Sequence, residues 1–163
     1  MAARVITISD AASRGEREDT SGPLVADALE RAGWRVDRVE IVPDETERIA
    51  GAIVAATDED GIRLVVTTGG TGLAPRDLTP EAVERIAEKT IPGFGELMRL
   101  RSLEKTKMAP LSRAQAVTRG AALVISLPGS PRGALENLEA VLHLVPHALE
   151  LLGGKPVERH PTG

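Results

Sequence analysis

The stretch of sequence that decides the fold is Val65-Val66-Thr67-Thr68-Gly69-Gly70-Thr71-Gly72-Leu73-Ala74-Pro75-Arg76-Asp77-Leu78-Thr79-Pro80-Glu81. Its first residues form a short β-branched run that is typical of a buried strand. The glycine-rich loop that follows lets backbone N–H groups come close to a bound anion, because glycine has no Cβ in the way. Thr79 is expected to cap the next helix, with Pro80 at its first position and Glu81 in its first turn. This order predicts a phosphate site at the carboxyl end of a sheet.

A tight strand-to-helix turn that happens to need glycine is the competing interpretation of this stretch. The pair Arg76-Asp77 in the same loop favours a functional site. Two common nucleotide-binding patterns are missing, however. No Lys follows Gly72, as the P-loop requires, and the residues after the first predicted strand lack the glycines of the dinucleotide fingerprint.

The length and composition indicate one globular domain. The chain has 163 residues, of which 42% are hydrophobic and 27% charged, and both fractions are ordinary for a soluble protein. We therefore expect a single domain over residues 1–163, with residues 154–163 as a loose C-terminal tail. No apolar run is long enough to span a bilayer and no secretory signal is visible, so the expected location is the cytoplasm, without a membrane partner.

Several classes of function are disfavoured by what the composition lacks. Cysteine is absent, which removes disulfides, thiolate zinc sites and cysteine nucleophiles. Only two aromatic residues, Trp34 and Phe94, are present and the net charge is −4, so we expect no nucleic-acid partner. His143 and His147 are four residues apart, but Pro146 lies between them and no third ligand follows at a matching spacing. They are interpreted as helix-surface histidines.

Strands and helices alternate along the chain. Short apolar runs predict strands at residues 5–9, 34–42, 64–68 and 121–127. Apolar residues at helical spacing predict helices that begin at Ser21, shortly after Glu45, at Thr79, within residues 90–107 and at Pro131. Ser130 can cap the last helix, Pro146 should kink or break it, and Gly153 should end it. This alternation predicts a three-layer α/β domain with a mostly parallel sheet.

The loops that follow parallel strands meet at one edge of a sheet, where ligands bind. Here those loops are residues 10–19, 43–45, 69–77 and 128–133. Asp44 and Asp77 each lie just beyond a strand end, and paired carboxylates in this place suit Mg²⁺ held together with substrate phosphates. The alternative is that Asp44 caps the following helix and Asp77 makes a loop hydrogen bond. Arg76 and Arg132 are placed to meet an anionic ligand, or are solvated surface arginines.

Residues 68–72 and 75–82 together resemble the signature of the MogA/MoaB family of molybdenum-cofactor biosynthesis. Further segments agree with the family in the same order. They are residues 9–15 with 19–23, and then Val42-Pro43-Asp44-Glu45, Pro92-Gly93-Phe94-Gly95-Glu96, Leu111-Ser112-Arg113 and Leu127-Pro128-Gly129-Ser130-Pro131. The resemblance extends from Val5 to about Leu152. Ser130 stands where the family usually has Asn.

The resemblance implies a molybdopterin-binding fold, usually a trimer, and transfer of the adenylyl group of ATP to molybdopterin with Mg²⁺ and release of pyrophosphate. The family's functional aspartates fall on Asp44 and Asp77, which are expected to be catalytic and to hold the metal. The substrate and phosphate contacts are expected from Thr68, Gly69, Gly70, Thr71, Gly72, Arg76, Ser112, Gly129 and Ser130. A downstream molybdenum-insertion protein is a further expected partner. The family also contains members of uncertain activity, so a non-catalytic molybdopterin-binding or scaffold protein is the alternative.

Overall fold

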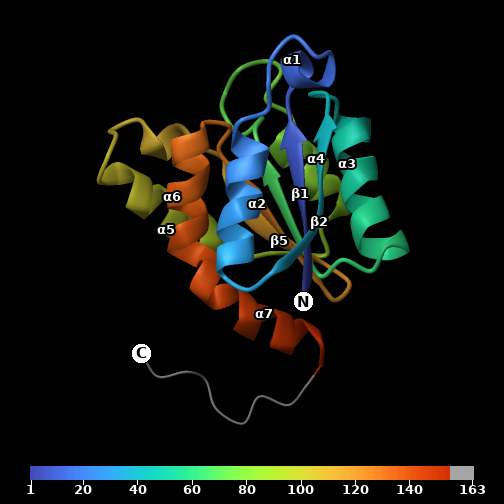
Figure 1. The fold of residues 1–163 in the computed structure, drawn as a ribbon. Helices are drawn as coiled ribbons and strands as arrows, with labels where there is room; N and C mark the ends of the chain where they lie inside the picture. Colours follow the sequence, from blue (N-terminus) through green and yellow to red (C-terminus); the bar gives the residue numbers. More distant parts are fainter. Residues whose placement is uncertain (155–163) are drawn as a thin grey trace.

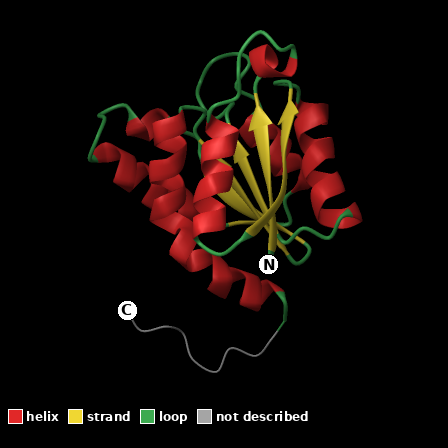
Figure 2. Ribbon diagram, viewed as in Figure 1, coloured by secondary structure: helices red, strands yellow, loops and turns green. Residues whose placement is uncertain are grey.

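The computed structural model of the chain describes residues 1–154. Its centre is a six-stranded sheet in the order β2-β1-β3-β6-β5-β4, shown in Figure 2. The strands β1 (Ala2–Ile8), β2 (Arg35–Val42), β3 (Leu64–Thr68) and β6 (Ala122–Leu127) are parallel to their neighbours in this set. The strands β5 (Gln115–Arg119) and β4 (Lys89–Thr90) continue the sheet in antiparallel pairing. The predicted α/β fold with a mostly parallel sheet is confirmed.

Helices cover both faces of the sheet and make the domain three layers deep (Figure 1). One face carries α2 (Ser21–Arg31), α5 (Pro92–Leu103), α6 (Pro131–Val141) and α7 (Val145–Leu152). The other face carries α3 (Thr46–Val54), its π-helical extension η1 (Ala55–Glu59) and α4 (Thr79–Ile86). The short helix α1 (Asp10–Ser13) lies above the carboxyl ends of the strands. Two 3₁₀ turns, η2 (Ala109–Leu111) and η3 (Leu142–Leu144), complete the described elements.

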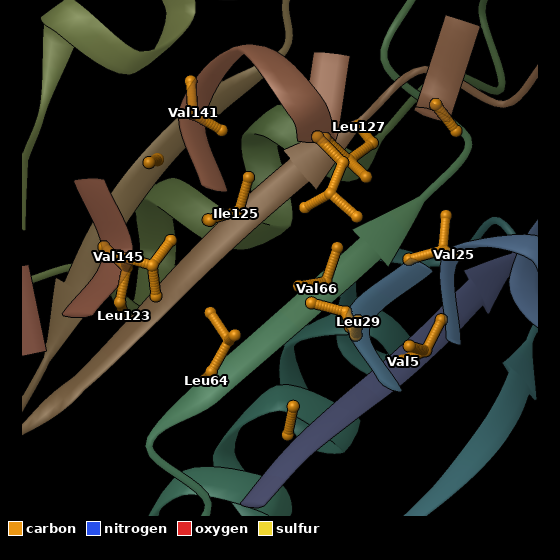
Figure 3. Close-up of a cluster of buried hydrophobic side chains, with 14 of the residues drawn as sticks. Val5, Val25, Leu29, Leu64, Val66, Leu123, Ile125, Leu127, Val141 and Val145 are labelled. Atoms are coloured by element: carbon orange, nitrogen blue, oxygen red, sulfur yellow. The ribbon is translucent and has the colours of Figure 1, made fainter. Parts of the chain in front are cut away.

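The alternation of side chains along each strand creates one hydrophobic core on each face. In β1, Val5 packs with α2 and α6, whereas Ile6 packs on the α3 and α4 side. Figure 3 shows the first core, where Val66 and Ile125 of the sheet lie among side chains of α2 and of the C-terminal helices. Burying each such side chain contributes about 1.5–3 kcal/mol. These two cores hold the strands in place, and the strands in turn position the loops at their carboxyl ends.

The structure corrects several expectations about single elements. The antiparallel strands β4 and β5 were not predicted from the sequence. The helix expected within residues 90–107 is confirmed as α5, Pro92–Leu103. The helix that begins at Pro131 stops at Val141, before the 3₁₀ turn η3 and therefore before Pro146. Pro146 then lies in the first turn of α7, which Gly153 ends as expected.

The start of α4 also differs from the expectation. Leu78, not Thr79, is its N-cap residue, and Thr79 and Pro80 are its first two helical residues. The Thr79 hydroxyl donates to the Gly69 carbonyl oxygen over 2.8 Å instead of capping the helix. Of the expected tail at residues 154–163, all but Gly154 lies outside the described residues. Over the part that the structure describes, no helix is long and apolar enough to cross a lipid bilayer.

Candidate active site

The loops after β1, β2, β3 and β6 meet at the carboxyl edge of the sheet, as expected, and enclose a cleft of about 420 Å³. Figure 1 shows this edge at the arrowheads of the strands, beside α1. The side chains and backbone that line the cleft come from Thr7, Ile8, Ser9, Ala12, Arg17, Glu18, Asp19, Thr20, Ser21, Asp44, Thr68, Gly69, Gly70, Asp77, Gly129, Ser130 and Pro131. The cleft thus brings together seven of the predicted site residues, which are Asp44, Thr68, Gly69, Gly70, Asp77, Gly129 and Ser130.

The glycine loop is shaped by positions that exclude any side chain. Gly69 and Gly70 have φ angles of +110° and +64°, a conformation that other residues rarely adopt. A Cβ on Gly69 would overlap the carbonyl oxygen of Ile8, and a Cβ on Gly70 would overlap the Thr79 hydroxyl. The loop therefore passes close to β1 and to α4. Just before it, the Thr68 hydroxyl donates to the Pro128 carbonyl oxygen over 2.8 Å, which joins the loop to the turn after β6.

Asp44 is held by a reciprocal pair of hydrogen bonds with Asp10. Its Oδ2 accepts the Asp10 N–H over 2.7 Å, and its own N–H donates to Asp10 Oδ1 over 3.0 Å. The Oδ1 of Asp44 accepts no hydrogen bond within residues 1–154 and would lie 3.2 Å from a Cβ on Gly70. Burial raises the pKa of Asp44 above its ordinary value, and the nearby carboxylates of Asp10 and Asp77 add to this increase. A cation at this carboxylate would relieve both effects.

Asp77 is the second carboxylate of the cleft. Its Oδ2 accepts the Ala74 N–H over 2.8 Å, so the predicted loop hydrogen bond exists, and the side chain still lines the cleft. A Cβ on Gly72 would lie 2.7 Å from this oxygen, so glycine there allows the loop to fold against the carboxylate. No cluster of three or more His, Cys, Asp or Glu among the described residues could hold a metal ion. A cation at Asp44 or Asp77 would therefore need further ligands from a substrate or from water.

The structure separates Arg76 from the cleft lining. Its guanidinium makes two hydrogen bonds of 2.9 Å with the carboxylate of Asp10. Although desolvation opposes the change, the Asp44 N–H and the Arg76 guanidinium hold the pKa of Asp10 below its usual value. Arg76 thus acts on Asp44 through Asp10, which orients Asp44, and its positive charge also partly offsets the rise in the pKa of Asp44. Arg132 is likewise paired, with Glu136 at 2.9 Å.

The remaining predicted residues, Thr71, Gly72 and Ser112, line a neighbouring hollow of about 350 Å³. This hollow shares Gly70, Asp77 and Gly129 with the cleft. The Ser112 hydroxyl accepts the Ala114 N–H over 3.3 Å. Apart from Arg76, the predicted site residues therefore line two adjoining compartments, and Asp77 borders both.

Arg113 is a structural organiser of the loop that the sequence left without a role. Its Nε donates to the Gly72 carbonyl oxygen over 2.9 Å, and its Nη2 donates to the Asp77 carbonyl oxygen over 2.7 Å. Its backbone N–H donates to the Thr71 carbonyl oxygen over 2.8 Å. Its Nη1 pairs with Glu81 of α4, and this contact lowers the pKa of that carboxyl. One side chain therefore fixes both ends of the segment that carries Asp77.

Asp19 and Arg17 also line the cleft, and neither was among the predicted site residues, although Asp19 belongs to a segment that resembles the family. Asp19 accepts the Thr7 hydroxyl over 2.6 Å and the Gly22 N–H over 2.9 Å, so it fastens the start of α2 to the end of β1. Asp is a residue type favoured near helix starts, and here its side chain accepts an N–H in the first turn of α2. No comparable signal marks Arg17, which lies in the loop after α1.

Comparison with known proteins gives consistent results. The chain matches the family described as "Probable molybdopterin binding domain" over residues 4–160. It is 44% identical over 154 residues to the molybdopterin adenylyltransferase of Helicobacter pylori, covering 92% of this chain and 86% of that protein. It is 38% identical over 171 residues to the molybdopterin adenylyltransferase of Escherichia coli, covering 96% of this chain and 88% of that protein.

A solved structure shares the same architecture. The crystal structure of the molybdopterin biosynthesis enzyme MoaB from Thermus thermophilus matches with a TM-score of 0.88 and 48% sequence identity. The match covers 95% of this chain and 98% of that one. The similarity therefore extends over nearly the whole chain.

Proposed function

The chain belongs to the molybdopterin binding domain family, and from this premise we propose that it is a molybdopterin adenylyltransferase of molybdenum-cofactor biosynthesis that uses Mg-ATP. The observation that carries the proposal is the placement of Asp44 and Asp77 around one glycine loop in one cleft. The curated relatives of similar length bear the same name. The reaction joins two anionic substrates, and the local donors of this edge are what make their approach feasible.

In the proposed reaction, a terminal phosphate oxygen of molybdopterin attacks the α-phosphorus of ATP. A new P–O bond forms, the bond from the α-phosphorus to the oxygen that bridges to the β-phosphate breaks, and pyrophosphate leaves. Little covalent work falls to the protein, so positioning and charge neutralisation are its main contributions. The product, adenylylated molybdopterin, would then pass to a protein that inserts molybdenum.

We assign the divalent cation to Asp77 and Asp44. Mg²⁺ prefers carboxylate and phosphate oxygens, and bound there it would neutralise charge on the ATP phosphates. The raised pKa of Asp44 supports this assignment, since a cation would stabilise the carboxylate that its surroundings destabilise. Asp10 and Arg76 hold Asp44 in place from outside the cleft.

The glycine loop and the turn after β6 are assigned to the phosphates. Gly69 and Gly70 leave their backbone open to the cleft, and Gly129 lies against Gly69, where a Cβ would come within 3.2 Å of its Cα. Ser130 caps α6 by accepting the Gly133 N–H, so the positive end of that helix borders the cleft. Thr71, Gly72 and Ser112 would contact the substrate that occupies the adjoining hollow.

A homotrimer is part of the proposal. Apolar side chains on α5 and in the following loop are exposed on the single chain, namely Leu97, Leu100, Leu103, Met108 and Leu111. A surface of this kind supports burial against another copy. Light scattering should give the mass of three chains. A cytoplasmic location stays a prediction.

The alternative is a non-catalytic protein that binds molybdopterin or serves as a scaffold. The paired carboxylates favour the enzyme, because binding alone does not need two acidic groups beside a phosphate loop. Incubation of the protein with molybdopterin and Mg-ATP separates the two functions. Pyrophosphate released only when both substrates are present supports the enzyme, whereas tight molybdopterin binding without pyrophosphate supports the binding module.

A further inference from the structure

The charges that line the cleft are strongly unbalanced. The ionisable side chains in its wall are those of Arg17, Glu18, Asp19, Asp44 and Asp77. Both proposed substrates are anionic, so an acidic wall would repel them unless positive groups compensate. A divalent cation would offset the Asp44 and Asp77 side of the cleft. The single cationic side chain of the lining is that of Arg17, in the loop that leads into α2.

The other arginines at this edge are already committed to partners. Arg76 pairs with Asp10, and Arg113 is used by Glu81 and by backbone carbonyl groups. Arg132 pairs with Glu136, and Arg14, three residues before Arg17, pairs with Glu16. Arg17 makes no hydrogen bond or ion pair with any residue of the described chain, although it has acidic neighbours on both sides in the sequence.

The loop holds Arg17 at the cleft while leaving its side chain free. Two residues further on, Asp19 is fastened by the Thr7 hydroxyl at 2.6 Å and by the Gly22 N–H at 2.9 Å. Before it, the Glu16 N–H donates to the Ala11 carbonyl oxygen of α1 over 2.9 Å. The backbone on both sides of Arg17 is therefore fixed, and its guanidinium is available to a ligand in the cleft.

We propose that Arg17 is a substrate-positioning residue that binds a phosphate group of one of the two substrates, either ATP or molybdopterin. The inference rests on the proposed function for the identity of these ligands, but not on catalysis by the cleft. A guanidinium matches two phosphate oxygens at once, which makes the contact orienting as well as attractive. The contact is present both before and during transfer, so it lowers KM and leaves kcat nearly unchanged.

The test uses the full chain with three single substitutions. Arg17→Gln removes the positive charge, and Arg17→Lys keeps the charge but lacks the paired N–H donors of the guanidinium. Arg14→Gln is the matched control, because Arg14 lies in the same loop but outside the cleft lining. Calorimetric titrations measure the Kd of Mg-ATP and, separately, the Kd of molybdopterin. Thermal unfolding of each variant verifies the fold, and steady-state assays give KM and kcat.

We expect Arg17→Gln to raise the Kd of one of the two ligands by about tenfold. This is the scale of one charge-assisted hydrogen bond that is partly open to water. The ligand that weakens identifies the phosphate that Arg17 binds. Arg17→Lys should recover about half of the loss on a logarithmic scale, and Arg14→Gln should stay within about twofold of the unchanged protein.

Binding of both ligands within about twofold by a folded Arg17→Gln variant would overturn the inference. An equal loss in Arg14→Gln would also overturn it, because the effect would then be one of net charge. A protein that releases no pyrophosphate but loses ligand affinity in Arg17→Gln refutes the proposed function and retains this contact. The two failures are thus distinguishable.

Discussion

The Asp10 N–H donates to Asp44 Oδ2 over 2.7 Å, and the Asp44 N–H donates back to Asp10 Oδ1 over 3.0 Å. The two residues are 34 positions apart and each follows one of two neighbouring strands, so the parallel pairing of β1 with β2 brings them together. The pKa values of the two carboxyl groups are shifted in opposite directions. Asp10 is matched by Arg76 and has a lowered pKa, whereas Asp44 faces the cleft and has a raised one.

Asp44→Asn should stabilise the protein at neutral pH. The folded-state pKa of Asp44 lies above its unfolded value, so its contribution favours folding at low pH and is lost as the pH rises through the folded-state pKa. At pH 7 the ionised carboxylate therefore costs stability, and Asn removes that cost while its side-chain oxygen can still accept the Asp10 N–H. We expect a gain of up to about 1 kcal/mol, or about 2–4 °C in Tm.

Asp10→Asn provides the control of opposite sign. Asp10 has a lowered pKa, so it stabilises the fold above its unfolded pKa and this stability is lost as the pH falls through the folded-state value. Its variant should lose stability at pH 7. Thermal unfolding of both variants at pH 7 and pH 3 checks the pair of predictions. A gain for Asp44→Asn that is as large at pH 3 as at pH 7 would contradict the electrostatic explanation.

Magnesium binding should weaken as the pH falls through the raised pKa of Asp44. Protons compete with the cation for this carboxylate, so the loss should begin at a higher pH than the ordinary Asp value of about 3.9. Titration of the protein with Mg²⁺ between pH 4 and pH 8, in the presence of ATP, measures the dependence. Asp44→Asn should bind Mg²⁺ more weakly and with less pH dependence. Equal pH profiles for the two proteins would remove Asp44 from the metal site.

Gly70→Ala should damage both the fold and the reaction. The positive φ angle of +64° and the overlap of a Cβ with the Thr79 hydroxyl force the loop to move, at a cost of about 1–3 kcal/mol. Because Asp44 Oδ1 would lie 3.2 Å from the new carbon, the transfer rate should also fall by at least about tenfold. Chemical unfolding and pyrophosphate release measure the two effects.

Gly51→Ala is the matched control for that substitution. Gly51 lies inside α3, and a Cβ there would meet no heavy atom within 4 Å. Alanine should therefore stabilise the helix by about 0.5–1 kcal/mol without changing the transfer rate. A similar loss of activity in both variants would mean that the glycine loop has no special role.

Arg113→Gln should loosen the loop that carries Asp77. The change leaves the carbonyl oxygens of Gly72 and Asp77 without their donors, at a cost of about 1–3 kcal/mol in the free energy of unfolding. We expect kcat to fall by about tenfold, because Asp77 is no longer held in one place. The control is Arg85→Gln, which breaks an exposed ion pair with Glu47 and should change stability by no more than about 0.5 kcal/mol. Equal kcat values for both variants would contradict the prediction that Arg113 holds the loop that carries Asp77.

Much of the fold and of the site was accessible to sequence reasoning. The strands β1, β3 and β6 are short β-branched or apolar runs, and parallel strands necessarily bring their following loops to one edge. The strand β5 was missed because its polar ends, Gln115 and Arg119, leave only a short core of buried residues. It pairs antiparallel with β6, so it does not belong to the strand–helix alternation from which the other strands were predicted.

The features of the site that could not be predicted from the sequence are contacts between residues that lie far apart along the chain. Arg76 was expected to contact the ligand, and its contact with Asp10, which lies 66 positions away, could not be predicted. Thr79 was expected to cap α4, but its hydroxyl is used by the Gly69 carbonyl oxygen. The role of Arg113 likewise depends on carbonyl groups that only the folded loop presents to it.

The most direct test of the account is the single-turnover rate of adenylyl transfer by Asp77→Asn and Asp44→Asn. Both variants, mixed with molybdopterin and Mg-ATP and followed by pyrophosphate release, should keep the fold and bind molybdopterin, but should transfer at least about a hundredfold more slowly. Asp77 borders both compartments, so its variant should lose the most. Single-turnover rates equal to that of the unchanged protein in both variants would contradict the central claim that these two carboxylates carry the reaction.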